Sequence, residues 1–274
     1  SACATAPVSR TAVAPRPSPP ARASGHPLVV PLGRTADTVR RVTQQMRRDR
    51  RSAVMVLTLP PALFWLLQQI FRDNPAAFDR VGVGLLGVFP LMTMFFQTSV
   101  AMLRERRSGT LERLLTTPVG RGELLTGYAI AFSGLAVAQA GVTTAVAVGL
   151  LGLNVAGPLP MLLLIAVLAS VFGTALGLLT SAFAYTEFQA VQFLPPVLLP
   201  QFLLCGILVP RDEMHPVLDT ISALLPMTYV VDALNQLSSS PEMNSRILVD
   251  ALVIAGCVVV ALALAAGTLR RRGG

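Results

Sequence analysis

The chain has 274 residues, of which 53% are hydrophobic and only 13% are charged, and its mean hydropathy is +0.63. Soluble domains carry about 25% charged residues. The composition therefore excludes an ordinary soluble globule, a disordered chain and a disulfide scaffold, and it predicts an all-α membrane protein. The net charge is +8 and all 22 basic residues are arginine. Without a lysine, this sequence contains no Walker A motif and no Schiff-base nucleophile.

Histidines and cysteines are too few and too scattered for a metal centre or a nucleophilic triad. The two histidines, His26 and His215, lie far apart, and the sequence contains neither an H-E-x-x-H nor a C-x-x-C motif. Cys205 and Cys257 fall in apolar runs, where cysteine behaves as a small hydrophobic residue. We therefore expect no catalytic residue, no metal site and no cofactor in this chain.

The N-terminal region has two parts with different patterns. Residues 1–33 are rich in Pro, Ala and Arg, which predicts a disordered leader that lacks the apolar core of a signal peptide. Over residues 34–52, Val39, Val42 and Met46 recur on one helical face among arginines. This pattern predicts a basic amphipathic helix on an anionic membrane surface. A basic run can also bind nucleic acid, but an apolar span follows at once, so we expect no nucleic-acid partner.

A membrane domain is expected over residues 53–269, followed by a tail at 270–274. A bilayer core of about 30 Å is crossed by about 20 apolar helical residues, and six stretches satisfy this requirement. The six expected spans are Ala53–Phe71, Val81–Leu103, Leu124–Leu153, Leu159–Ala184, Phe188–Val209 and Ile247–Leu269.

Arginine is distributed unequally between the two sides of this arrangement. Segments on the side of the N-terminus hold 18 arginines, and segments on the other side hold 4. Cytoplasmic loops are enriched in Lys and Arg, so both termini are predicted to be cytoplasmic. The replacement of all lysine by arginine, together with abundant alanine, is typical of a GC-rich bacterial genome. We therefore expect a multi-pass protein of the bacterial plasma (inner) membrane.

The expected spans carry almost no charge, which argues against an ion-driven transporter, because such proteins keep ionisable groups at mid-membrane. Uncharged polar residues occur instead, among them Gln97, Gln139 and Gln192. They either form hydrogen bonds between helices or line a path for an amphiphilic substrate. Three prolines between residues 195 and 200 predict a break in the fifth span, which is either a static kink or a moving gate.

Small residues recur four apart in two of the expected spans. Such a spacing lets helix backbones approach closely, so it predicts tight packing without requiring a binding site. The residues are Gly141, Ala145 and Gly149 in the third span and Ala169, Gly173 and Gly177 in the fourth.

Two loops carry the remaining patterns. The inner loop, Arg104–Glu123, is charged, has an apolar edge of leucines and reaches a helix-ending proline at Pro118. It predicts a short cytoplasmic coupling helix between spans two and three that docks a soluble partner. The outer loop, residues 210–246, holds two helical apolar stripes separated by Pro226. These stripes predict a re-entrant hairpin between spans five and six, or two helices lying flat at the interface.

These loops also carry two recognisable signatures. The inner signature is Arg104-Glu105, Gly109–Leu114 and Thr117-Pro118, followed by Glu123 and Gly127, and the outer signature is Leu224–Leu234. With them, residues 40–270 resemble the membrane subunit of type-2 ABC exporters, the family that includes daunorubicin-resistance permeases and nodulation-factor exporters. The helix over 34–52 is similar to the interface helix of that family.

The resemblance implies roles for particular residues. The segment that couples to the ATPase would contain Glu105, Arg106, Gly109, Thr110, Leu111, Glu112, Leu114, Leu115, Thr117 and Pro118. The outer re-entrant motif would contain Pro226, Thr228, Tyr229 and Asp232.

The resemblance also implies partners and an activity. A separate cytoplasmic P-loop ATPase subunit would bind ATP and Mg²⁺, and a second permease protomer, identical or different, would complete the transporter in the lipid bilayer. The chain itself would be no enzyme but would export a hydrophobic or amphiphilic substrate, such as a drug-like compound, a lipid or a glycolipid. The alternatives are a polysaccharide or glycoconjugate exporter, an ion-coupled secondary transporter, a membrane-embedded enzyme and a regulatory partner of a motor.

Overall fold

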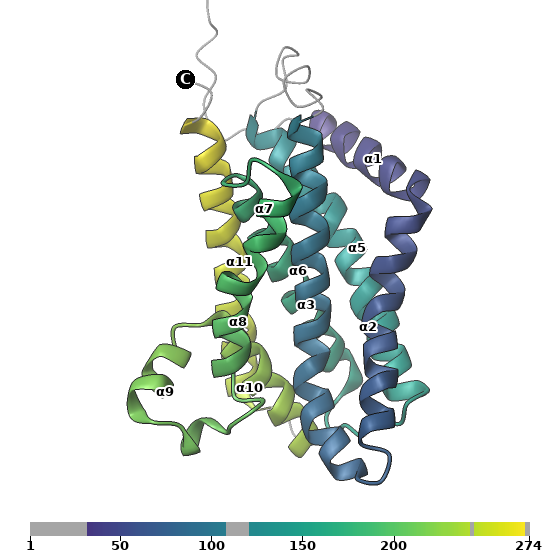
Figure 1. Cartoon of the computed structure of the whole chain (residues 1–274), viewed down its shortest axis with the longest axis vertical. Coiled ribbons are helices and arrows are strands. Elements are labelled where there is room, and N and C mark those ends of the chain that lie inside the picture. Colours follow the sequence, from purple (N-terminus) through teal and green to yellow (C-terminus); the bar gives the residue numbers. More distant parts are fainter. Residues whose placement is uncertain (1–31, 108–120, 242–243, 272–274) are drawn as a thin grey trace, which may run out of the picture.

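The structure is a computed structural model, and it describes residues 32–107, 121–241 and 244–271. Every regular element among these residues is a helix, which confirms the all-α prediction for them. Most of the expected leader, and the last residues of the expected tail, lie outside the described residues. Figure 1 shows long helices packed side by side, with α1 at the same end of the bundle as the carboxyl end of α11.

The prediction that one helix covers residues 34–52 is wrong at the carboxyl end of that range. Instead, α1 spans Leu32–Arg48, and α2 spans Arg50–Ile70. Asp49 separates them as the N-cap of α2, where its carboxylate accepts a hydrogen bond from the backbone N–H of Ser52 at 3.2 Å. Capping satisfies a free amide of the first helical turn, so the chain can change direction at Asp49. Figure 1 shows α1 leaning across the end of the bundle.

Five helices among the described residues are long and apolar enough to cross a membrane. They are α2, α3 (Pro75–Arg107), α5 (Arg121–Gly149), α6 (Leu159–Ser181) and α11 (Ser245–Arg271), and each coincides with an expected span. With 33 residues, α3 is about 50 Å long at 1.5 Å per residue. It is therefore longer than an apolar bilayer core, and at least one of its ends projects beyond that core.

The expected fifth span, Phe188–Val209, is not one continuous helix. Two short helices replace it, α7 (Glu187–Gln192) and α8 (Leu194–Leu204), and the helical conformation ends before Val209 is reached. The expected break is confirmed, but it lies at Phe193, just before the first two prolines, whereas the third proline is accommodated inside α8. Figure 1 shows α7 and α8 following one another from the α1 end toward the opposite end.

The centre of the bundle is the contact between α3 and α6. A Cβ atom built on Gly173 would overlap the carbonyl oxygen of Leu91, and one built on Gly177 would lie 2.6 Å from the carbonyl oxygen of Phe95. The spacing of small residues in the fourth span therefore does allow close packing, as predicted. The same prediction is wrong for the third span within the described residues, because a Cβ on Gly141 or Gly149 would have no neighbour within 4 Å.

The loop between the fifth and sixth expected spans contains a 3-10 turn, η1 (Arg211–Glu213), and two helices, α9 (Pro216–Ser222) and α10 (Pro226–Ser239). The two expected helical stripes are thus confirmed as helices, and Pro226 begins the second. The pair bends by 94° and together makes a sixth candidate span by length and composition. Figure 1 shows α9 projecting from the end opposite to α1. That the pair re-enters the membrane stays a prediction.

Candidate functional site

Three consecutive residues in the last turn of α3 each contact a different element. Arg104 donates two hydrogen bonds to the carboxylate of Glu187 on α7, at 2.9 and 3.0 Å. Glu105 accepts one from Arg41 on α1 at 3.2 Å, and Arg106 donates one to the carbonyl oxygen of Ser181 at the end of α6, at 2.6 Å. The last turn of α3 therefore connects α1, α6 and α7 immediately before the expected coupling segment.

The contact around Glu105 also reaches α5. The same nitrogen of Arg41 that binds Glu105 donates to the hydroxyl of Tyr128 at 2.8 Å, and the guanidinium lies 6.0 Å from the centre of that ring. The side chain of Glu105 is only 15% exposed, so solvent screens this ion pair less than a surface pair. Because α5 begins at Arg121, helices on both sides of the coupling segment are tied to α1.

The contact between Arg104 and Glu187 is more open to solvent. The two side chains are 60% and 45% exposed, so this ion pair adds little to the stability of the fold. The hydrogen bond from Arg104 nevertheless lowers the pKa of Glu187, which keeps this carboxylate ionised. The bidentate contact between the guanidinium of Arg104 and the carboxylate of Glu187 fixes the first turn of α7 relative to the end of α3.

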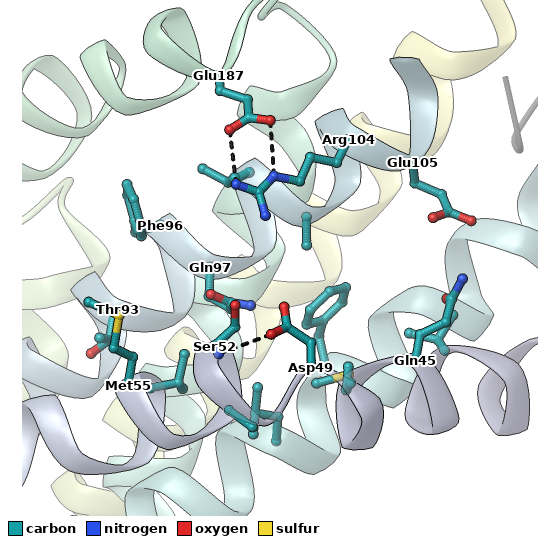
Figure 2. Close-up of a pocket in the computed structure, with 18 of the residues that line it drawn as sticks. Gln45, Asp49, Ser52, Met55, Thr93, Phe96, Gln97, Arg104, Glu105 and Glu187 are labelled. Atoms are coloured by element: carbon teal, nitrogen blue, oxygen red, sulfur yellow. Dashed lines mark hydrogen bonds and ion pairs between the residues drawn. The ribbon is translucent and has the colours of Figure 1, made fainter. Parts of the chain in front are cut away.

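A groove of about 720 Å³ lies beside these contacts, between α1, α2, α3, α5 and α7. Figure 2 shows Asp49 and Ser52 on one wall and Gln97, Arg104 and Glu187 on the facing wall. Its volume is in the range of pockets for drug-sized ligands. Apolar side chains dominate the rest of the lining, among them Met46, Met55, Val56, Leu59, Phe96 and Phe132.

The structure does not bring the three expected substrate-path residues together. Gln97 lines the groove. Gln139 is buried and donates a hydrogen bond to the carbonyl oxygen of Val56 at 3.0 Å, so it acts as a link between α5 and α2. Gln192 is exposed on α7 and does not line the groove.

The expected coupling residues are described only in part. Glu105 and Arg106 lie in α3, where they form the contacts above. Arg106 therefore holds the end of α6 in this conformation. The remaining expected residues lie outside the described residues: Gly109, Thr110, Leu111, Glu112, Leu114, Leu115, Thr117 and Pro118.

The outer motif stabilises the bend between α9 and α10. The hydroxyl of Thr228 donates to the carbonyl oxygen of Ser222, and the hydroxyl of Tyr229 to that of Ala223, both at 2.8 Å. These bonds supply side-chain donors to carbonyl oxygens at the carboxyl end of α9, and the carbonyl oxygen of Ser222 also accepts a hydrogen bond from the backbone N–H of Leu225. The motif thus has an intramolecular role that the sequence did not indicate.

Asp232 of the outer motif forms an ion pair with Arg211 at 2.9 Å, and Arg211 also binds Asp219 at 2.8 Å. One arginine thus connects η1 to both helices of the bent pair. Replacing Asp232 with asparagine should loosen the pair, because it removes the charge from the less exposed of the two carboxylates. We expect faster proteolysis within residues 210–225, measured by limited digestion in detergent. Asp212→Asn is the matched control, and equal digestion of both variants would contradict the role of Asp232.

Sequence reasoning missed Arg41, Tyr128, Glu187 and Arg211 as partners of the motif residues. Glu187 could have been found, because it is the single charged residue in the short connection after the fourth span. The choice of Arg41 among the many arginines of α1 had no such signal. No group of three or more potential metal ligands occurs in the described part of the chain.

Comparison with known proteins assigns the chain to a family. Residues 38–238 match the sequence profile of the family described as ABC-2 type transporter. This match covers most of the chain, so the chain belongs to the ABC-2 type transporter family, as its loop signatures predict.

Several curated relatives are permeases. The chain is 29% identical over 209 residues to "Probable multidrug ABC transporter permease YbhS" of Escherichia coli, covering 75% of this chain and 55% of that protein. It is 27% identical over 168 residues to "Inner membrane transport permease YhhJ" of the same species, covering 60% and 45%. It is 26% identical over 183 residues to "Linearmycin resistance permease protein LnrN" of Bacillus subtilis, covering 66% and 46%. The chain spans about half the length of these relatives.

Proposed function

We propose that the chain is a membrane subunit of an ATP-driven exporter that moves a hydrophobic or amphiphilic compound out of the cytoplasm or the inner leaflet. Family membership and the similarity to the multidrug and linearmycin-resistance permeases support a transport role. The mostly apolar groove with a polar end supports an amphiphilic substrate over a polysaccharide. ATP and Mg²⁺ would be bound by a separate P-loop ATPase subunit.

The observation that carries this proposal is the set of contacts made by the last turn of α3. A motor that pushes on the segment after Arg107 would move α3 first. Through Arg104, Glu105 and Arg106 the displacement would pass to α7, α1 and α6 together. Since α1, α3 and α7 line the groove, its width would change with the state of the motor. Only contacts that differ between two states can transmit such energy.

The proposal includes an orientation and a second protomer. The α1 end of the bundle would face the cytoplasm, in agreement with the arginine distribution. A second copy or a related permease would cover part of α2, whose Val54, Trp65 and Ile70 are more than half exposed. Lipid would cover the remainder.

The proposal is tested by purifying the tagged full chain from gently solubilised host membranes and identifying the proteins that accompany it. We expect a stoichiometric P-loop ATPase whose activity rises when a transported amphiphile is added. In vesicles, export should need ATP and should persist when ion gradients are collapsed. Export that follows an ion gradient and needs no ATPase would overturn the proposal in favour of a secondary transporter.

A further inference from the structure

Helix α1 keeps its apolar side within the protein. Val42 is buried, and Val39 and Met46 pack against the same core, to which α2, α3 and α5 also contribute. A Cβ atom built on Gly127 of α5 would lie 2.7 Å from the Cβ atom of Thr38, so α1 and α5 are in close contact. The side of α1 that could enter a bilayer is therefore already covered by the protein, and the surface that α1 presents outward is polar and charged.

The arginines around the junction of α1 and α2 differ from Arg41, which is held by Glu105 and Tyr128. Four of them, here called the junction arginines, are exposed: Arg47, Arg48, Arg50 and Arg51. They form no ion pair with any residue that the structure describes. Asp49 is the single acidic residue between positions 38 and 72, so residues 47–51 carry a net charge of +3 when this carboxylate is ionised.

The length of α2 places two of the junction arginines at the boundary of the bilayer. Helix α2 has 21 residues and is about 32 Å long at 1.5 Å per residue, which matches an apolar core of about 30 Å. A helix of this length that crosses the core has its first turn, here with Arg50 and Arg51, at the level of the lipid head groups. Figure 1 shows α1 sloping from the end of the bundle to its junction with α2 at the side. The junction is therefore set back from the end of α3, where the proposed motor would act.

An exposed stripe runs along α2 from Arg51. Met55 and Leu59 follow it at intervals of four residues, which places all three on one side of the helix, and all three are exposed. Met55 and Leu59 also lie in the lining of the groove. The stripe thus begins with a cation and continues with apolar side chains, which is complementary to a phospholipid with an anionic head group. An acidic protein surface would match the arginines but not the apolar residues that follow them.

We propose that Arg50 and Arg51 bind the phosphate of an anionic phospholipid, whose acyl chain lies along Met55 and Leu59 at the edge of the groove. The remaining junction arginines strengthen the positive field around the head group. Arginine forms bidentate hydrogen bonds with phosphate oxygens, and each basic residue near an anionic lipid surface adds about fivefold to binding. The bound lipid holds the α1–α2 junction at the membrane. This site needs neither a motor nor a transported compound, so it goes beyond the proposed export.

The test counts lipids bound to the full chain by native mass spectrometry, after delipidation in a neutral detergent and without nucleotide. The probes are phosphatidylglycerol and phosphatidylcholine with identical acyl chains, titrated separately. We expect the wild-type chain to bind phosphatidylglycerol about tenfold more tightly. In Arg50→Gln/Arg51→Gln the preference should fall to about twofold, whereas Arg50→Lys/Arg51→Lys should retain most of it, because the charge remains.

The matched control is Arg72→Gln/Arg80→Gln, which removes two exposed arginines beyond the opposite end of α2 and should leave the preference near tenfold. Equal binding of the two lipids by the wild-type chain, or an undiminished preference in Arg50→Gln/Arg51→Gln, would overturn the proposal. A preference lost equally in the control would also overturn it, because total charge would then decide binding.

The lipid site and the proposed export fail separately. Because lipid binding is measured on the chain alone, absence of an ATPase from the purified complex would overturn the proposed function and leave this result unaffected. Conversely, if Arg50→Gln/Arg51→Gln kept its lipid preference but lost a co-purifying ATPase, the junction arginines would serve the motor, and the lipid proposal would be wrong. Unchanged circular dichroism and elution volume of the variants confirm that the fold is intact.

Discussion

Gly173→Ala is expected to lower the stability of the bundle by about 3 kcal/mol, the upper part of the usual range for overpacking. The added Cβ would overlap backbone atoms of Leu91, and backbone cannot swing aside as a flexible side chain can. Either α3 and α6 separate, or the surrounding core deforms. The measurement is the thermal unfolding midpoint of the purified chain in detergent, with the yield of monodisperse protein as a second observable.

Gly141→Ala is the matched control for this variant. It makes the same substitution in the interior of another spanning helix, but the new Cβ meets nothing within 4 Å among the described residues. Alanine favours a helix over glycine by up to about 1 kcal/mol, so a neutral or slightly higher midpoint is expected. If the two variants unfolded at the same temperature, the close contact between α3 and α6 would not be a determinant of stability.

The second large effect is expected at Glu105. Glu105→Ala should lower ATP-dependent export by about tenfold, within the range of coupling energies between distant sites, while membrane insertion is unchanged. The reason is that Arg41 would lose its carboxylate partner, and α1 would no longer follow the end of α3. Export of a fluorescent amphiphile from inverted vesicles, normalised to the amount of permease, gives the measurement.

A double-mutant cycle distinguishes this coupling from a general loss of structure. Arg41→Ala should reduce export to a similar degree, and combining it with Glu105→Ala should add little, because both changes remove the same ion pair. Arg40→Ala, at an exposed neighbouring position, is the control and should leave export near the wild-type rate. Fully additive losses for Arg41 and Glu105 would contradict a shared role.

The positions of the long helices could be predicted from the sequence, because hydropathy over about 20 residues reports burial in a bilayer directly. The interruptions were predicted less well. The separation of α1 from α2 depends on the side chain of Asp49, which interrupts a basic pattern that otherwise reads as continuous. In the fifth span, the prolines indicated a break, but the position of that break at Phe193 depends on packing.

Partners across the fold could not be predicted from sequence spacing. Glu105 was identified by its place in a family signature, yet its contact with Arg41 joins residues 64 positions apart. Gln139 and Gln97 are the same residue type in neighbouring spans, but only the orientation of each helix decides which one forms an interhelical hydrogen bond and which one lines the groove. For the same reason, small-residue spacing identified the packed face of α6 and misassigned that of α5.

The order Arg-Glu-Arg at the end of α3 limits how that helix can move. Successive residues of an α-helix point about 100° apart, so a rotation of α3 by one residue in either direction would turn Arg104 or Arg106 toward Arg41. Both rotations would replace an attraction with a repulsion between like charges. The alternating charges of these three residues therefore oppose rotation of α3 about its axis. A helix that cannot rotate about its own axis can still tilt or slide. A force applied at Arg107 would therefore tilt or shift α3 without rotating it.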